Sequence, residues 1–422
     1  MTRILVVQNL YPPHHYGGYE QSCHDVVERW RDRGHDVTVL TGDHRVRGVP
    51  DAAAEPGVRR ELPVAIADGV LASPPRLQRL RRERAAQRIL RAAIEETEPD
   101  VVSVWHMAGV PAGLLHALVA TELPLVYVVC DDWLSYVQTS DPWLRMFAVR
   151  PRLGRLAARF TRLPTAPIDL GPTGAFCFVS DCTRRRSEAH TGWTFPLATV
   201  TFSGIDTTDF PIALSAPTAR PWQGRLLYVG RLDERKGVGT AIRAMARLPD
   251  ATLELVGPGD AASRRRFEVL AAESGVAGRV TFSAPVPRAG LRDRYAAADA
   301  LVFPSEWDEP FGLVPVEAMA CASPVVATAT GGSAEFLVDG DNCLVFAPGD
   351  AAALAAAVTR LSADAGLRRR LVGGGSRTAS ALTADGLADV LEAWHEGAAA
   401  RFAGGRPPDR RLPFGQPASG PA

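Results

Sequence analysis

The 422-residue sequence is poor in features that would supply a covalent framework or a strong electrostatic bias. Its six cysteines are scattered, and they form neither a C-x-x-C pair nor a regular spacing. This usage argues against a disulfide scaffold and fits reduced thiols in a cytosol. Lysine plus arginine equals aspartate plus glutamate at 47 each, so the overall charge indicates neither nucleic acid nor membrane as a partner.

The sequence also has no long uninterrupted apolar run. Its most apolar stretch, residues 108–130, contains His116, Glu122 and two prolines, so we expect it not to span a bilayer. The opening MTRILVVQNL leads directly into a predicted strand, without the pattern of a signal peptide, and we therefore expect a cytoplasmic protein. The length favours two domains, and a composition that is 46% hydrophobic and 22% charged is ordinary for a globular protein.

Strand and helix patterns alternate through the first half of the chain. Cys23, Val26, Val27 and Trp30 have helical spacing, and Gly34 predicts the end of that helix. Short apolar runs rich in branched residues predict buried parallel strands at 3–10, 36–42, 100–105, 124–129 and 175–180.

The same alternation restarts in the second half, with predicted strands at 225–230, 251–257, 279–282, 300–305 and 324–329. Residues 205–224 are rich in Pro, Ser and Thr and have no period, which predicts a linker. The expected fold class is therefore α/β, with two Rossmann-like doubly wound domains whose strands face a central cleft at their carboxyl ends.

These patterns give an expected division of the chain. We expect an N-terminal domain at 1–212, a C-terminal domain at 218–385, and a disordered Pro/Gly-rich tail at 403–422. Between them, 386–402 predicts a helix that could return to the N-terminal domain, with Leu387, Val390, Leu391 and Trp394 on its apolar face.

The segment GRLDERKG (230–237) leaves a predicted strand and enters a helix. Its Arg231 and Lys236 at the carboxyl end of a strand could clamp an anion together with the N–H groups of the helix. Solvated loop charges would give the same pattern, and the segment alone does not decide between the two.

The segment EPFGLVPVE (309–317) places two carboxylates beside a predicted helix start. If the helix begins near Gly312, Glu309 lies just before it and Glu317 lies in its second turn. The N–H groups of Phe311, Gly312 and Leu313 would face a phosphate or sugar oxygen, and the carboxylates would accept hydrogen bonds from vicinal hydroxyls. A negatively charged helix start without a ligand would explain Glu309 but not Glu317.

Taken together, these segments resemble retaining glycosyltransferases of family 4, which have the GT-B fold. The spacing E-x-F-G-x4-E, with GRLDERKG some seventy residues upstream, carries much of the resemblance. It extends through LELVGPGD (253–260), ADALVFPS (298–305) and GGSAEFLVDGDNCLVF (331–346), and at the other end through the glycine-rich 17–42. It covers nearly the whole chain except the tail.

The resemblance implies a role for each matching residue. Arg231 and Lys236 would bind the donor diphosphate and stabilise the leaving group, Glu317 would hold the ribose, and Glu309 would contact the transferred sugar. The backbone of Phe311, Gly312, Leu313 and Val314 would complete the pocket, Gly257 would make room for the base, and Gly17 and Gly18 would approach the phosphates. The scheme needs no metal and no cofactor besides the nucleotide diphosphate sugar, which would be a co-substrate.

One position departs from the family pattern. In many relatives the strand that matches 124–129 ends in a histidine-aspartate pair, whose histidine contacts the donor sugar. Here Cys130 takes the place of that histidine, while Asp131 is kept. We expect Cys130 to be a packing residue rather than a nucleophile. His106 is an alternative cleft residue, although a lone histidine is more often structural.

Acceptor recognition is expected in the N-terminal half. Tyr16, Asp131 and Asp132 would suit a polyhydroxylated or amine-bearing acceptor, and Trp133 could stack on it or simply pack in the core. Two arginine-rich stretches, 76–91 and 145–162, could be basic amphipathic helices on an anionic membrane, but a solvated face is favoured for both.

The sequence therefore predicts an enzyme that transfers a sugar from a nucleotide diphosphate sugar, with UDP as the first choice, to a hydroxyl group with retention of configuration. The acceptor, which could be a small molecule, a glycan or a lipid-linked sugar, is not identified. Two alternatives stay open: a non-catalytic relative that binds the sugar nucleotide, and a hydrolase or epimerase on the same fold. Nucleic acid is not an expected partner.

Overall fold

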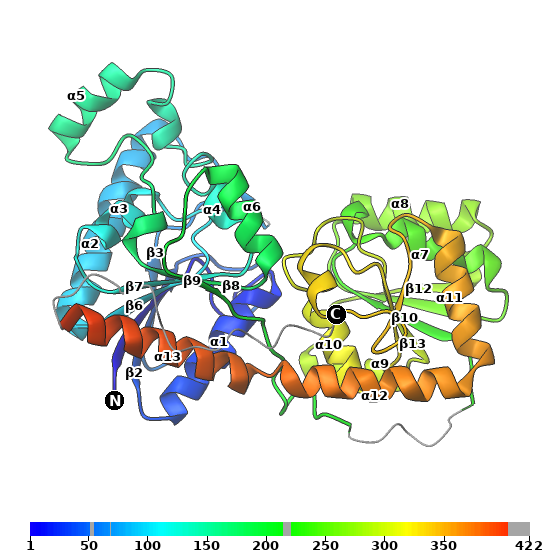
Figure 1. Ribbon diagram of the computed structural model, residues 1–422. Coiled ribbons are helices and arrows are strands. Elements are labelled where there is room, and N and C mark those ends of the chain that lie inside the picture. Colours follow the sequence, from blue (N-terminus) through cyan, green and yellow to red (C-terminus); the bar gives the residue numbers. More distant parts are fainter. Residues whose placement is uncertain (51–54, 68, 214–220, 404–422) are drawn as a thin grey trace. The chain divides into compact units, whose positions relative to one another are not determined.

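The computed structural model describes residues 1–50, 55–67, 69–213 and 221–403, and its strands and helices form two α/β units (Figure 1). The strands are β1 (Arg3–Val7), β2 (Asp36–Gly42), β3 (Val58–Leu62), β4 (Ile66–Ala67), β5 (Val70–Leu71), β6 (Val101–Val104), β7 (Leu125–Val129), β8 (Ala175–Phe178), β9 (Ala198–Val200), β10 (Arg225–Val229), β11 (Thr252–Val256), β12 (Val280–Ser283), β13 (Ala300–Phe303), β14 (Val325–Ala327) and β15 (Leu344–Val345). The helices are α1 (Gly18–Asp32), α2 (Arg76–Thr97), α3 (Gly113–Val119), α4 (Trp133–Tyr136), α5 (Pro151–Thr161), α6 (Asp181–Thr191), α7 (Val238–Ala244), α8 (Ala261–Glu273), α9 (Arg288–Ala297), α10 (Leu313–Ala320), α11 (Ala351–Ala363), α12 (Ala365–Ala381) and α13 (Ala384–Ala403). Short 3-10 turns are η1 (Leu144–Met146), η2 (Gly171–Thr173), η3 (Glu234–Lys236), η4 (Met245–Arg247), η5 (Ala277–Arg279) and η6 (Gly331–Glu335).

The first large sheet has seven parallel strands in the order β3-β2-β1-β6-β7-β8-β9. From β1 the chain moves outward through β2 and β3, and then returns to place β6 on the other side of β1. The strand order therefore reverses between β1 and β6. Such a reversal leaves a crevice at the carboxyl ends of the two strands, because the connections that follow them turn away in opposite directions.

The second large sheet repeats this plan with six parallel strands in the order β12-β11-β10-β13-β14-β15. Its order reverses between β10 and β13, which are neighbours in register from Leu226 opposite Ala300. The predicted doubly wound α/β architecture is confirmed in both halves. A separate two-stranded antiparallel hairpin, β4-β5, was not predicted.

Helices cover both faces of each sheet because the strands are apolar on both sides (Figure 1). In the first sheet, the predicted helix face of α1 is confirmed, since Cys23, Val26, Val27 and Trp30 are all 0% exposed. In the second sheet, one core joins the strands to α7, α8 and α11, and another joins them to α9 and α10. Among the described residues, no helix combines the length and apolarity that a membrane crossing needs.

The chain separates into two compact units. Unit 1 comprises Met1–Phe178, Arg184–Val200 and the chain from Asp389, and unit 2 comprises Val179–Thr183 and Thr201–Ala388. Apart from the short segment Val179–Thr183, the chain passes from unit 1 to unit 2 at 200/201, whereas the expected boundary is 212. The backbone around Ile205 pairs with Thr383 near the start of α13. The expected tail lies almost wholly outside the described residues, as do residues 214–220 of the expected linker.

The greater part of α13 belongs to unit 1, where it packs against α1 and the residues that follow α1. Leu387, Leu391 and Trp394 are buried as expected, but Val390 is 41% exposed, so the apolar face is narrower than the sequence indicated. Glu392 accepts hydrogen bonds from Arg33 at 2.5 Å and from His35 at 2.9 Å. These contacts attach α13 to unit 1 through ion pairs at the rim of an apolar interface.

His395 lies at the centre of this interface. Its ring packs edge-on against Trp30 at 4.9 Å between centroids, and its Nδ1 donates to the Leu391 carbonyl at 2.6 Å. The side chain is 0% exposed, and no described residue donates to Nε2. Burial lowers the pKa of His395 to about 4, because the apolar surroundings disfavour the imidazolium.

Acid should therefore weaken the attachment of α13. A histidine with a depressed pKa in the folded state contributes its full stability above its ordinary pKa of about 6.5, and this contribution falls as pH drops toward 4. The shift corresponds to a loss of about 3 kcal/mol over that window. We expect urea unfolding between pH 7.5 and 4 to show this loss in the wild type and not in His395→Leu. Parallel pH curves for the two proteins would contradict the assignment.

Candidate functional site

Two loops of unit 2 follow the strands at which the second sheet reverses. Residues 230–237 follow β10, and residues 304–312 follow β13. The loops are packed backbone to backbone: Glu306 N donates to Arg235 O at 2.8 Å, and a Cβ on Gly237 would lie 1.8 Å from Pro304 O. Gly237 also has a φ of +68°, so only glycine fits there without strain. The topology thus brings together the two segments that the sequence selected.

Lys236 and Glu309 form an ion pair across these two loops. The Nζ of Lys236 lies 2.7 and 2.8 Å from the two carboxylate oxygens, and Ser305 Oγ donates to the same carboxylate at 2.7 Å. Glu309 is 4% exposed, so its charge is compensated almost entirely by these donors. Lys236 also lies 5.1 Å from the ring centroid of Trp307, a cation–π contact that further fixes the ammonium group.

The helix start predicted in EPFGLVPVE is confirmed. Gly312 is the N-cap of α10 with a φ of +102°, and Pro315 lies in the first turn. Glycine is required at 312 because a side chain would be strained at this φ. Phe311 is 3% exposed and packs on Phe336 at 4.8 Å between centroids, so only its backbone is available to a ligand. Leu313 and Val314 are half-buried.

Glu317, in the second turn of α10, accepts a hydrogen bond from the Tyr295 hydroxyl of α9 at 2.7 Å. Burial and the nearby Glu317 carboxylate raise the pKa of Tyr295 well above its ordinary value, so the phenol remains a donor. This bond orients the carboxylate toward one position. Glu317 is half-buried, unlike Glu309.

Arg231 and Gly257 complete the predicted donor set of unit 2. Arg231 is exposed, and its carbonyl accepts from the Tyr228 hydroxyl at 2.7 Å. Its guanidinium has no ion pair within the part of the chain that the structure describes. Gly257 has a direct packing role, since a Cβ there would lie 2.0 Å from Gly230 O, so it allows the ends of β10 and β11 to meet.

Sequence reasoning missed the residues that hold these loops in place. Gly332 N donates to Glu309 O at 2.6 Å, and a Cβ on Gly331 would lie 2.5 Å from the same oxygen. The Gly-Gly pair at 331–332 was visible in the sequence and pointed to a close backbone approach. Ser305 and Trp307 gave no such signal, because the pairing of their loop with Lys236 depends on the folded topology.

Unit 1 holds the remaining predicted residues, at the reversal between β1 and β6. Gly17 is the N-cap of α1, and its N–H is already bonded to the Glu20 carboxylate at 2.9 Å. Gly18 is the first residue of α1. The Tyr16 hydroxyl lies 3.0 Å from His44 Nε2. The loop is therefore ordered by its own contacts, and Gly17 offers no spare N–H to a phosphate.

His106, just after β6, is joined to Asp131, which follows β7. The His106 Nε2 lies 3.0 Å from Asp131 Oδ2 and 3.1 Å from the Tyr136 hydroxyl, and the Tyr19 ring stacks 4.4 Å away. Burial would raise the pKa of Asp131, but the His106 charge and the hydrogen bonds outweigh it and hold the pKa below its usual value. Asp131 thus stays ionised and orients the imidazole.

The other residues of this loop have structural partners. Trp133 is 0% exposed and packs in the core of unit 1, so of its two predicted alternatives core packing is confirmed and a stacking platform is wrong. Asp132 pairs with Arg186 of α6. Burial, and then the charges of Asp131 and Glu20, raise the pKa of the Cys130 thiol, which disfavours a nucleophilic thiolate.

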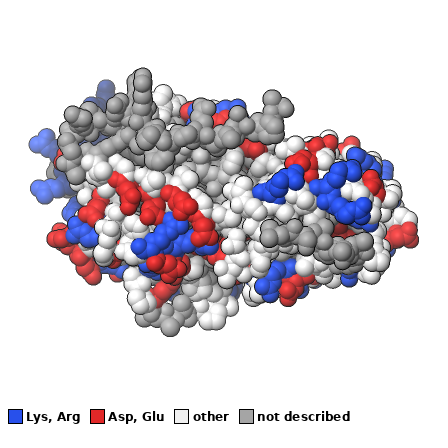
Figure 2. Space-filling view, turned by 60° about the horizontal axis from the view of Figure 1, so that its bottom comes forward, with Lys and Arg blue, Asp and Glu red and all other residues white. Residues whose placement is uncertain are grey.

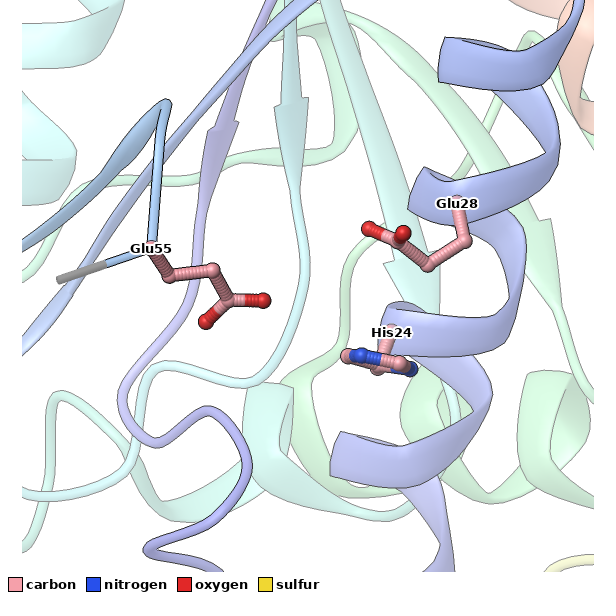
Figure 3. Close-up of side chains that lie close together, drawn as sticks. All are labelled: His24, Glu28 and Glu55. Carbon is pink, nitrogen blue, oxygen red and sulfur yellow. The ribbon is translucent and has the colours of Figure 1, made fainter. Parts of the chain in front are cut away.

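Two groups of side chains among the described residues of unit 1 have the composition of a metal site, and in one of them, His35 with Glu392 and Glu396, Glu392 is already paired with Arg33. In the other, His24 and Glu28 on α1 and Glu55 before β3 point toward one another, with ligand atoms within 4.8 Å (Figure 3). However, Arg31 bonds Glu28 at 2.9 Å and Arg60 bonds Glu55 at 3.2 Å. These guanidinium groups already compensate the carboxylate charges, and a cation would have to displace them.

Comparison with known proteins agrees with this arrangement. Residues 218–377 match the family described as Glycosyl transferases group 1, and residues 16–209 match Glycosyltransferase Family 4. The two matches correspond to the two halves that the sequence patterns separated. The chain therefore belongs to the family 4 type of glycosyltransferases with the GT-B fold.

Individual relatives show how far the likeness extends. A D-inositol 3-phosphate glycosyltransferase of Thermomonospora curvata is 36% identical over 184 residues, which are 41% of this chain and only 42% of that protein. A glycogen synthase of Mycobacterium tuberculosis is 29% identical over 408 residues, which are 87% of this chain and 88% of that protein.

Solved structures show the shared fold. Sucrose-phosphate synthase from Thermosynechococcus elongatus has a TM-score of 0.71 at 23% identity, covering 95% of this chain and 100% of that chain. Anabaena HepE in complex with UDP-glucose has a TM-score of 0.65 at 19% identity, covering 93% and 100%. At these identities the likeness is one of fold alone.

The Lys236–Glu309 pair should contribute measurably to stability. We expect Lys236→Met to cost about 1 to 3 kcal/mol, because it leaves a buried carboxylate without its counter-charge, while part of the loss is relieved by solvent at the half-buried lysine. Glu309→Gln should cost less, because the ammonium can reach water. The double variant should recover most of the loss, since the glutamine can still accept from Ser305. Urea unfolding without ligand checks this, and equal losses in Lys236→Met and the double variant would contradict the pairing.

Proposed function

We propose that this protein is a retaining glycosyltransferase that moves a sugar from a UDP-linked donor to a hydroxyl group. The observation that carries the proposal is the Lys236–Glu309 pair, held between the two loops that follow the reversal strands β10 and β13. Ligands of open α/β sheets bind at this point of the topology. The choice of a nucleotide sugar is supported by relatives of the same fold that bind UDP-glucose and ADP.

The ion pair suggests how donor binding and catalysis are linked. A donor diphosphate would compete with Glu309 for the Lys236 ammonium. The released carboxylate would then accept hydrogen bonds from hydroxyl groups of the transferred sugar. Exposed Arg231 would add a second cation. Positive charge aimed at the leaving diphosphate stabilises the transition state most where it is already oriented before the reaction.

The remaining residues support a metal-independent, retaining scheme. Arg231, Lys236 and the N–H groups at the start of α10 would supply the positive charge that a metal ion supplies in other transferases. Glu317, oriented by Tyr295 at 2.7 Å, would hold the ribose hydroxyls. We propose same-face attack by the acceptor without an enzyme nucleophile, because Glu309 is engaged with the sugar and the Cys130 thiol is protonated.

Arg231 gives a cleaner test of leaving-group stabilisation than Lys236, because its guanidinium has no ion pair among the residues that the structure describes. We expect Arg231→Ala to lower turnover on the order of a hundred- to thousandfold with unchanged unfolding. Arg235→Ala is the matched control, since Arg235 is in the same loop but is paired with Asp233 at 2.9 Å. The measurement is release of nucleoside diphosphate from a panel of donors, with mass spectrometry of the glycosylated product.

The same assay separates the alternatives. Stabilisation of the protein by UDP without any turnover would favour a non-catalytic binding relative, and donor consumption without a glycosylated product would favour a hydrolase or epimerase. Equal activity of Arg231→Ala and wild type would remove Arg231 from the mechanism.

His106 should act on the acceptor side, because it belongs to unit 1 and is oriented by Asp131. We expect His106→Ala to lower transfer at least tenfold while the thermal stabilisation by UDP is unchanged. His116→Ala, a histidine of α3 outside this network, is the control for purely structural loss. If both variants lose the same activity, or if His106→Ala loses UDP binding, the role is wrong.

A further inference from the structure

Helix α5 and the segments around it have an unusual charge. Between Asp141 and Asp169 the sequence contains no acidic residue and six arginines. Four of these, Arg152, Arg155, Arg159 and Arg162, lie in or directly after α5 and are exposed. None of these four arginines forms an ion pair with an acidic side chain among the described residues. The segment is therefore a patch of uncompensated positive charge in a chain whose charges balance overall.

The same helix carries a stripe of exposed apolar side chains. Val149 is 85% exposed, Leu153 and Leu156 are each 53% exposed, and Phe160 is 77% exposed. Val149 lies just before the helix, and the other three, at spacings of three and four residues on α5, lie within an arc of about 60° at roughly 100° per helical residue. Gly154, which is the buried residue of α5, lies on a different side of the helix. The stripe therefore faces away from the core of unit 1.

This exposure is built into the structure, because both flanks of α5 are fixed. Trp143 Nε1 donates to Pro164 O at 2.7 Å, and Trp143, Leu144 and Leu163 form a small core with Ala112. The Asp141 carboxylate accepts from the N–H groups of Trp143 and Leu144 at 2.9 and 2.8 Å. In Figure 1, α5 stands at the edge of unit 1, away from the strands.

The other arginine-rich helix behaves differently. In α2 the apolar residues Ala86, Leu90 and Ala93 are each 0% exposed, so its arginines surround a helix that already has a core partner. On the face of the molecule drawn in Figure 2, Lys and Arg lie beside Asp and Glu. The apolar residues of α2 are thus covered within unit 1, whereas those of α5 are exposed.

We propose that α5 is a docking surface for an anionic phospholipid membrane. A helix with an apolar stripe bordered by arginines lies in the interface of a bilayer, with the stripe inserted and the guanidinium groups at the headgroup phosphates. A second copy of the chain is a poorer occupant, because two such patches would repel each other. This surface is in unit 1 and uses none of the residues proposed for catalysis.

The test is co-sedimentation of the full-length protein with vesicles of phosphatidylcholine, with and without about 40% phosphatidylglycerol, which makes the vesicle surface strongly anionic. We expect binding only to the anionic vesicles, with a strong dependence on salt. Arg152→Gln, Arg155→Gln and Arg159→Gln together should weaken binding about a hundredfold, at about fivefold per arginine. Leu156→Gln with Phe160→Gln should weaken it on the order of tenfold or more.

The control is Arg81→Gln with Arg84→Gln and Arg88→Gln, the same change of charge on exposed positions of α2. It should bind the vesicles nearly as well as wild type, and all variants should keep the wild-type thermal midpoint and donor turnover. The proposal is overturned if wild type does not bind anionic vesicles, if the α2 control loses as much binding, or if the Leu156 and Phe160 changes have no effect. A change in oligomeric state of the α5 variants without vesicle binding would overturn it in favour of self-association.

Discussion

Compensation of the buried Glu309 charge is the constraint on which the candidate site depends. An ionised carboxylate at 4% exposure is tolerable only with donors at close range, and here they come from Lys236 and Ser305. Neither loop could hold this arrangement alone, because Lys236 and Glu309 are 73 residues apart. The glycines at 237 and 331 let the two loops and η6 approach to backbone contact. In the proposed function, a donor diphosphate would replace Glu309 as the partner of the Lys236 ammonium. The cation that would bind the diphosphate is therefore already held in place before the donor binds.

The order of the strands explains why these residues meet. In both large sheets the order in which the chain adds strands reverses at one point, between β1 and β6 in unit 1 and between β10 and β13 in unit 2. Each reversal leaves the carboxyl ends of two adjacent strands uncovered by crossover connections, and polar side chains gather there. In unit 2 these are Lys236 and Glu309, and in unit 1 His106 follows one reversal strand and is bonded to Asp131 after the next. The two units thus have the same reversal of strand order, but the polar residues that follow the reversal strands differ.

The sequence predicts the interior of this fold better than its edges. Every predicted strand is present, because interior parallel strands are apolar on both faces and stand out as short branched runs. Of the two large sheets, the strands that were missed are β3, β9 and β15, which lie at sheet edges. β3 reads VRREL, since an edge strand can expose polar side chains. The helix start at Gly312 could be predicted from local chemistry, whereas the pairing of Lys236 with Glu309, the bond from Tyr295 to Glu317 and the burial of Trp133 depend on contacts distant in sequence.

Helices α2 and α5 show why composition alone does not assign a surface. Both are rich in arginine with apolar residues at helical spacing, and from the sequence they supported the same interpretation. In α2 the apolar residues pack against β3 and α3, so their apolar surface is already buried within unit 1. In α5 the connecting segments are fixed by Asp141, Trp143 and Leu163, so the helix cannot turn its stripe inward without breaking those contacts. Leu153, Leu156 and Phe160 therefore remain exposed to water, and the proposed membrane contact would bury them. The arginines beside them are the reason that the proposed surface is an anionic one.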